Sequence, residues 1–77
     1  MPHKIFAERL NQELDNIELP SREDERIEAF SKMFHIPKFK AEALLQGIYL
    51  PDETLLTAIA LELEVDPNWL IGSAKSV

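Results

Sequence analysis

Four prolines divide the chain into short stretches, and each stretch has the apolar spacing of an α-helix. Pro20, Pro37, Pro51 and Pro67 each stand between two such stretches or at the start of one. Proline has no backbone N–H, so it breaks a helix interior but is tolerated in the first turn. The chain is therefore expected to fold as several short helices with tight connections.

The apolar residues predict five helices and one shared core. In the first stretch, from Ile5 to Ile17, they recur at steps of four, four and three, which places them on one helical face. The other four stretches show similar spacing. The residues expected to face the core are, in chain order, Phe6, Leu10, Leu14, Ile17; Ile27, Phe30, Met33, Phe34; Ala41, Leu44, Leu45; Leu55, Leu56, Ile59, Ala60, Leu63; and Trp69, Leu70, Ile71.

Polar residues and glycine mark the expected helix ends. Ser21 with Asp24 forms a plausible capping pair for the second helix, which is expected to end near Phe34. The third helix is expected from near Pro37 to about Gln46, with a glycine at position 47 suited to its end. Asp52 and Asp66, beside prolines, open the fourth and fifth helices. Residues 73–77 are expected to fray.

Composition predicts a single domain without metal or disulfide. The chain has 77 residues, 45% of them apolar, no cysteine and two histidines. Packing alone must therefore stabilise the fold, and good metal ligands are too few. No apolar run is long enough to span a membrane, and no signal-peptide pattern is present, so a cytoplasmic protein is expected. No serine has a recognisable catalytic partner and no glycine-rich phosphate loop exists, so we expect neither an enzyme nor a cofactor.

Charge is distributed unevenly along the chain. The formal net charge is −6, which argues against a non-specific polyanion binder. Between Glu28 and Glu42, however, the chain carries Lys32, Lys38 and Lys40 and no acidic residue. The acidity lies outside this segment, which remains suited to contact with phosphate.

A family resemblance appears at the same segment. The run AFSKMFHIPKFKAEALLQGIYLPDETLLTAIALELEVDPNWL resembles the lambda-repressor/Cro (xenobiotic-response-element) class of bacterial and phage DNA-binding domains. The preceding FAERLNQELDNIELPSREDERIEAF is similar to phage-repressor amino-terminal domains. The resemblance covers about 70 residues. It departs from the family at His35, where glycine is usual, and at Ile27, where a phosphate-binding glutamine is frequent.

The resemblance implies a five-helix, lambda-repressor-like fold with a helix-turn-helix at about residues 24–47. It further implies a cytoplasmic, nucleoid-associated repressor of bacterial or phage origin that binds double-stranded DNA. As a homodimer, it would place two recognition helices roughly 34 Å apart. The residues that the resemblance assigns to DNA contact are Lys38, Phe39, Lys40 and Glu42 at the bases, with Gln46 and Tyr49 nearer the backbone. Arg22 and Arg26, one turn apart, are expected to take over the phosphate contact that Ile27 cannot make.

Several of these residues have a second interpretation. Lysines 38 and 40 either contact DNA or solubilise an exposed helix, and Phe39 either touches a base or packs under the second helix. Arg22 and Arg26 either contact phosphate or pair with acids of their own helix. The segment Trp69–Leu70–Ile71 either caps the core or forms a dimer face. A rival function is a protein-interaction module or antitoxin-like partner built on the same scaffold.

Overall fold

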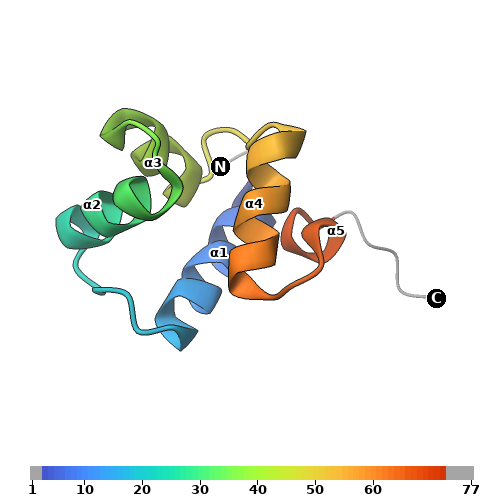
Figure 1. The fold of residues 1–77 in the computed structure, drawn as a ribbon, viewed down its shortest axis with the longest axis horizontal. Helices are drawn as coiled ribbons and strands as arrows, with labels where there is room; N and C mark the ends of the chain where they lie inside the picture. Colours follow the sequence, from blue (N-terminus) through green and yellow to red (C-terminus); the bar gives the residue numbers. More distant parts are fainter. Residues whose placement is uncertain (1–2, 73–77) are drawn as a thin grey trace.

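Five α-helices meet around one core in the computed structural model, which describes residues 3–72 (Figure 1). The helices α2 and α3 lie on one side, α4 and α5 on the other, and α1 contacts both groups. The structure has no β-strand within the described residues, which confirms an all-α protein of five helices. The helices are α1 Lys4–Asn16, α2 Glu23–Phe34, α3 Lys38–Leu45, α4 Glu53–Leu63 and α5 Pro67–Leu70.

The core contains residues from all five helices. Seven large side chains are fully buried, and burying each stabilises the fold by about 1.5–3 kcal/mol. The radius of gyration is 11.6 Å, close to the roughly 11 Å of a compact domain of this length. The fully buried side chains are Phe6, Leu10, Leu14, Phe30, Leu44, Ile59 and Leu70, and all seven were expected in the core.

Ile17 departs from the expected stripe of α1. The helix ends at Asn16, and Ile17 is 44% exposed. Glu18 then adopts a left-handed conformation with φ 64°, and the Leu19 N–H donates to the Leu14 carbonyl oxygen at 3.0 Å. This closure turns the chain back toward the core, so Leu19 packs there instead of Ile17.

The structure confirms some of the predicted helix starts and corrects others. Asp52 accepts a hydrogen bond from the Leu55 N–H, and Asp66 accepts one from the Asn68 N–H, both at 2.8 Å. The prediction of a Ser21 cap is wrong, because α2 has Arg22 at its N-cap and no side chain caps it. Pro37 lies one position before α3 rather than inside it. The expected fraying of 73–77 concerns residues outside the described range.

The link between α2 and α3 is three residues long, as predicted. His35 has φ 56° and ψ 47°, a left-handed conformation that histidine tolerates better than most residues. The Ile36 N–H then donates to the Ser31 carbonyl oxygen at 3.0 Å, which closes the end of α2. At the far end of α3, Gly47 has φ 74°, the backbone that glycine was expected to provide. No helix in the described range is long and apolar enough to cross a membrane.

Candidate nucleic-acid interface

The pair α2–α3 buries one face of α3 and leaves the other free. Ala41 and Leu44 of α3 are fully buried, as is Phe30 of α2. The rings of Phe30 and Phe34 lie 4.9 Å apart and tilted by 58°, which stiffens α2 next to the turn. Since α3 is only eight residues long, its orientation depends on this packing rather than on its own helix propensity.

The first turn of α3 projects away from the core. Phe39 is 75% exposed, although a phenyl ring is usually buried. The alternative in which Phe39 packs under α2 is therefore wrong. Lys38 and Glu42 are also exposed, and Lys40 is partly exposed. The structure thus brings an aromatic ring and two lysines together on one accessible turn.

Glu28 holds one of these lysines. The Lys38 Nζ lies 3.6 Å from Glu28 Oε1, and the Lys32 Nζ lies 3.1 Å from Glu28 Oε2. The hydrogen bond from Lys32, with the positive charge of Lys38, lowers the pKa of Glu28 below its ordinary value of 4.5. Lys38 is isolated from acids along the sequence but not in space. Lys40, by contrast, makes no ion pair with any residue between 3 and 72.

Arg26 is not available to phosphate, which corrects the prediction for this residue. Only 6% of it is exposed, and its guanidinium donates to acceptors of α1 and of the α1–α2 loop. The alternative, in which Arg26 pairs with an acid of its own helix, is only partly right, because the acid that pairs with Arg26 is Asp15 of α1. The acceptors are the carbonyl oxygens of Pro20 (2.7 Å), Asn11 (3.2 Å) and Leu19 (3.2 Å), with Asn11 Oδ1 (3.3 Å) and Asp15 Oδ1 (2.5 Å).

Arg22 remains accessible at the start of α2. Its side chain is 73% exposed, and Nε lies 3.7 Å from the equally exposed Asp24 Oδ1. A pair this exposed is weak, so phosphate can compete for the guanidinium. Three acids, Glu23, Asp24 and Glu25, follow it in the first turn of α2. Their carboxylates interact favourably with the positive end of the helix dipole, but they repel any phosphate placed there.

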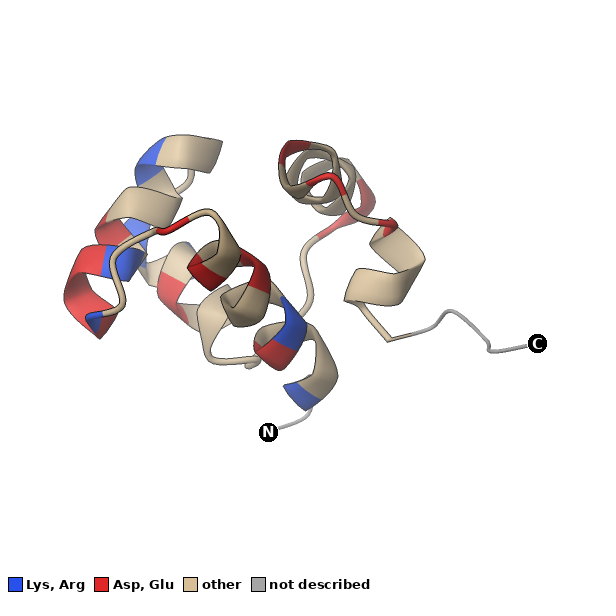
Figure 2. Ribbon diagram, turned by 90° about the horizontal axis from the view of Figure 1, so that it is seen from below, with Lys and Arg blue, Asp and Glu red and all other residues tan. Residues whose placement is uncertain are grey.

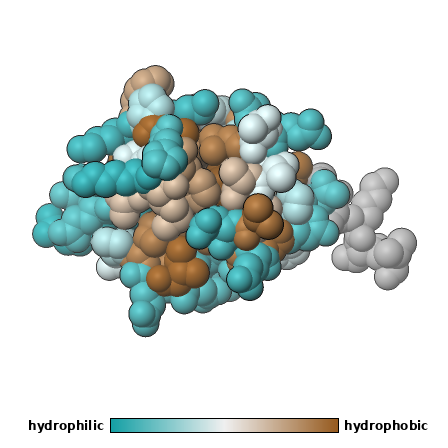
Figure 3. Space-filling model, viewed as in Figure 1, coloured by the Kyte–Doolittle hydropathy of each residue, from teal (hydrophilic) through white to brown (hydrophobic). Residues whose placement is uncertain are grey.

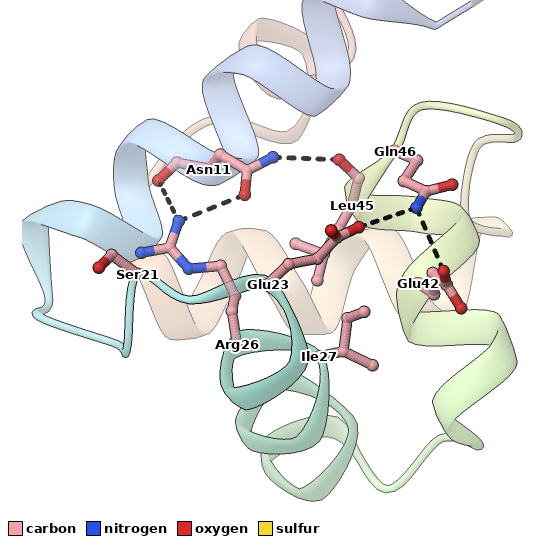
Figure 4. A pocket seen from close by; sticks show the side chains of 8 residues that line it. All are labelled: Asn11, Ser21, Glu23, Arg26, Ile27, Glu42, Leu45 and Gln46. Atoms are coloured by element: carbon pink, nitrogen blue, oxygen red, sulfur yellow. Dashed lines mark hydrogen bonds between the residues drawn. The ribbon is translucent and has the colours of Figure 1, made fainter.

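A hollow of about 190 Å³ lies where α1, the start of α2 and the end of α3 meet (Figure 4). At its edge the Gln46 Nε2 donates to Glu23 Oε2 at 3.0 Å and to Glu42 Oε2 at 3.2 Å. These two bonds turn the amide toward the two acids. Two residues predicted for DNA contact, Glu42 and Gln46, therefore also interact with each other. The lining residues are Asn11, Ser21, Glu23, Arg26, Ile27, Glu42, Leu45 and Gln46.

The remaining predicted residues lie nearer the core. Tyr49 is partly buried and packs against it, which leaves its ring only partly accessible. Leu70 is fully buried, so it cannot form a dimer face and that part of the prediction is wrong. Trp69 and Ile71 are partly buried beside it. The Arg9 guanidinium lies 4.8 Å from the centre of the Trp69 ring and donates to the Trp69 carbonyl oxygen.

Charge and apolar surface are distributed unevenly over the molecule. Residues 41–72 contain six acids and no lysine or arginine, and Figure 2 shows acidic positions alone along α4. At the other end of the molecule, α2 carries basic and acidic positions together, and the start of α3 carries basic positions (Figure 2). Figure 3 shows the face of the molecule on which α4 lies. Apolar residues gather in the middle of this face, and hydrophilic residues surround them.

Comparison with known proteins adds no family to this description. No family model, curated protein or solved structure matches the chain. Among residues 3–72, no group of three or more histidine, aspartate or glutamate side chains is placed to hold a metal ion. The interpretation of the site therefore depends on the geometry of α2 and α3 and on the sequence resemblance.

Proposed function

We propose that the protein is a sequence-specific DNA-binding transcriptional regulator that inserts α3 into the major groove. The observation that carries this proposal is the first turn of α3, where Phe39 is 75% exposed between two lysines. The three-residue link to α2 is short enough to fix the angle between the two helices. A helix-turn-helix requires that arrangement, with one helix across the backbone and the next in the groove.

Each exposed side chain of α3 suits a particular contact. Lys40, which has no acidic partner among the described residues, is able to donate to guanine O6 and N7 or to a phosphate. Phe39 offers an apolar surface to a thymine methyl group, and Glu42 is able to accept from cytosine N4 once Gln46 turns away. Arg22 takes the backbone contact that the buried Arg26 cannot make. Lys38 contributes after it separates from Glu28.

A homodimer completes the proposed function. A single eight-residue helix reads only a few base pairs, and two copies about one DNA turn apart, roughly 34 Å, would read a palindrome. Trp69 and Ile71 are partly exposed, and they would support a partner contact at α5. The proposed role is that of a repressor of phage or mobile-element type acting at the bacterial nucleoid.

Selection of sites from a random duplex library, at about 100 mM salt, tests this proposal. The wild type is compared with a Phe39→Ser, Lys40→Ala variant and with a Lys4→Ala control. Lys4 is an exposed lysine on α1, so its removal changes the net charge without touching α3. Enrichment of a palindrome by the wild type and the control, but not by the α3 variant, is the expected result. Absence of any enriched sequence with the wild type would refute the proposal.

A second function is favoured by one specific observation, the three acids in the first turn of α2. They occupy the place where a helix-turn-helix meets phosphate, and they favour a basic protein surface instead. Under this alternative, Phe39 would anchor a protein–protein contact. The salt dependence of DNA affinity separates the two functions. A DNA reader loses affinity steeply as salt rises, whereas an interaction module has little DNA affinity at any salt.

A further inference from the structure

Glu28 connects the two helices of the proposed DNA-binding unit. Its carboxylate oxygens face different ammonium groups, one on α2 and the other at the first residue of α3. Oε2 lies 3.1 Å from the Lys32 Nζ, and Oε1 lies 3.6 Å from the Lys38 Nζ. Each lysine thus has its charge partly balanced inside the protein.

The arrangement imitates the way a phosphate would be bound. A carboxylate between two ammonium groups provides the same negative charge and the same acceptor oxygens as a phosphate of the DNA backbone. Phosphate has access to this place, because the three side chains are between 48% and 74% exposed. A DNA strand at the first turn of α3 would therefore compete with Glu28 for Lys38.

We propose that Glu28 is a specificity-determining residue, an internal competitor that occupies Lys32 and Lys38 until base contacts favour DNA. The inference rests on the proposed function. Non-specific binding consists almost entirely of phosphate contacts, so an internal competitor weakens it most. At a matching sequence, Phe39 and Lys40 add contacts that Glu28 does not oppose, since no acid in the described part of the chain pairs with Lys40. The ratio between specific and non-specific affinity rises because a complex held by base contacts depends less on Lys32 and Lys38 than a complex held by phosphate contacts alone.

The expected effect follows from the distances. If a phosphate takes Lys38, the Glu28 carboxylate remains about 7 Å away, and the repulsion at a surface dielectric, reduced by salt screening, changes affinity about threefold to tenfold. Removing the carboxylate also frees Lys32 for phosphate, and each further phosphate contact steepens the salt dependence by about 0.9 in log–log slope.

The test compares Glu28→Gln with Glu25→Gln, a matched control. Glu25 lies on the same helix, is exposed, and forms no ion pair with any residue that the structure describes. Both variants remove one acid of α2 together with its repulsion of phosphate, and of these two acids only Glu28 contacts Lys32 and Lys38. The difference between the variants therefore isolates the contact with the lysines. Affinity is measured for a short duplex of random sequence and for the duplex selected by the wild type, between about 50 and 200 mM salt.

We expect Glu28→Gln to bind random duplex threefold to tenfold more tightly than Glu25→Gln does. The affinity of Glu28→Gln should also fall more steeply as the salt concentration rises. The gain should shrink in a Lys38→Ala background and disappear in a Lys32→Ala, Lys38→Ala background, where the competitor has lost both of its targets. Equal behaviour of the two variants would overturn the inference while the selected duplex still supports the proposed function. If neither the wild type nor the variants bind any duplex at the lowest salt, the proposed function fails and the inference fails with it.

Discussion

Arg26 provides the sharpest test of how the α2–α3 pair is held to the rest of the domain. Its guanidinium bridges α2 to α1 and to the loop between them through three backbone carbonyls, Asn11 Oδ1 and Asp15 Oδ1. Replacing Arg26 by methionine keeps much of the apolar stem but removes every donor. The acceptors then lose their partners in a region where water has limited access.

The magnitude follows from these contacts. Hydrogen bonds from a charged donor contribute about 1.5–3 kcal/mol each, but neighbouring bonds are not additive and Asp15 is well exposed. We expect Arg26→Met to lower the free energy of unfolding by about 3 kcal/mol, a large part of the roughly 4–12 kcal/mol available to a domain of this length. The melting temperature should fall by about 12–24 °C.

Urea and thermal unfolding followed by circular dichroism measure this loss. Asp15→Asn is the matched comparison, because it removes the ion pair and retains an acceptor for Arg26. We expect it to cost about 1 kcal/mol, since the Asp15 carboxylate is 63% exposed. A loss below about 1 kcal/mol for Arg26→Met would refute the reasoning. Equal losses for the two variants would place the effect in the ion pair and not in the carbonyl contacts.

Three further predictions concern single positions. His35→Gly should raise the free energy of unfolding by about 0.5 kcal/mol, because glycine adopts the left-handed conformation without steric cost. His35→Val should lower the free energy of unfolding by about 1–2 kcal/mol. Shifts of the urea midpoints in these directions, with unchanged slopes of the unfolding free energy against urea, would establish both. Asp52→Ala should lower the free energy of unfolding by about 1 kcal/mol, because it removes the acceptor of the hydrogen bond from the Leu55 N–H. An equal loss of stability in Glu53→Ala would contradict the capping role of Asp52. The pKa of Glu28 is lowered in the folded protein, so its stabilisation is present above its ordinary pKa of 4.5 and is lost as pH falls through the folded value. The urea midpoints of the wild type and Glu28→Gln should therefore differ at about pH 7 and converge near about pH 3, and a constant difference would show that the carboxylate charge is not responsible.

The helices were predictable from the sequence because their signals are local. Apolar spacing and the aspartates beside Pro51 and Pro67 identify where α4 and α5 begin. The helix ends were less predictable. Glycine identifies the left-handed end of α3, but Glu18 and Glu64 adopt the same conformation at the ends of α1 and α4. Glutamate has no preference for that backbone, so nothing in the sequence indicates it.

The candidate site was predictable as a segment but not as a set of partners. The exposure of Phe39 was left open by the sequence, since it depends on how far α3 rotates against α2. The pairing of Glu28 with Lys32 was readable from their spacing of four, whereas its contact with Lys38 requires the turn to bring α3 back. Arg26 was misread because its acceptors are mostly backbone carbonyls of α1 and a loop, which leave no side-chain signature.

The separation of charge between the two ends of the molecule has a consequence for how it meets a charged surface. The part of the chain from 41 to 72 has acidic residues and no lysine or arginine, while Lys32, Lys38 and Lys40 lie on α2 and the start of α3 (Figure 2). A polyanion therefore repels one end of the molecule more than the other and exerts a torque on it before contact. Productive orientations are reached in fewer collisions, so the benefit lies in the association rate rather than in the lifetime of a complex. Residues far from α3 would thus influence the speed of recognition without touching the partner.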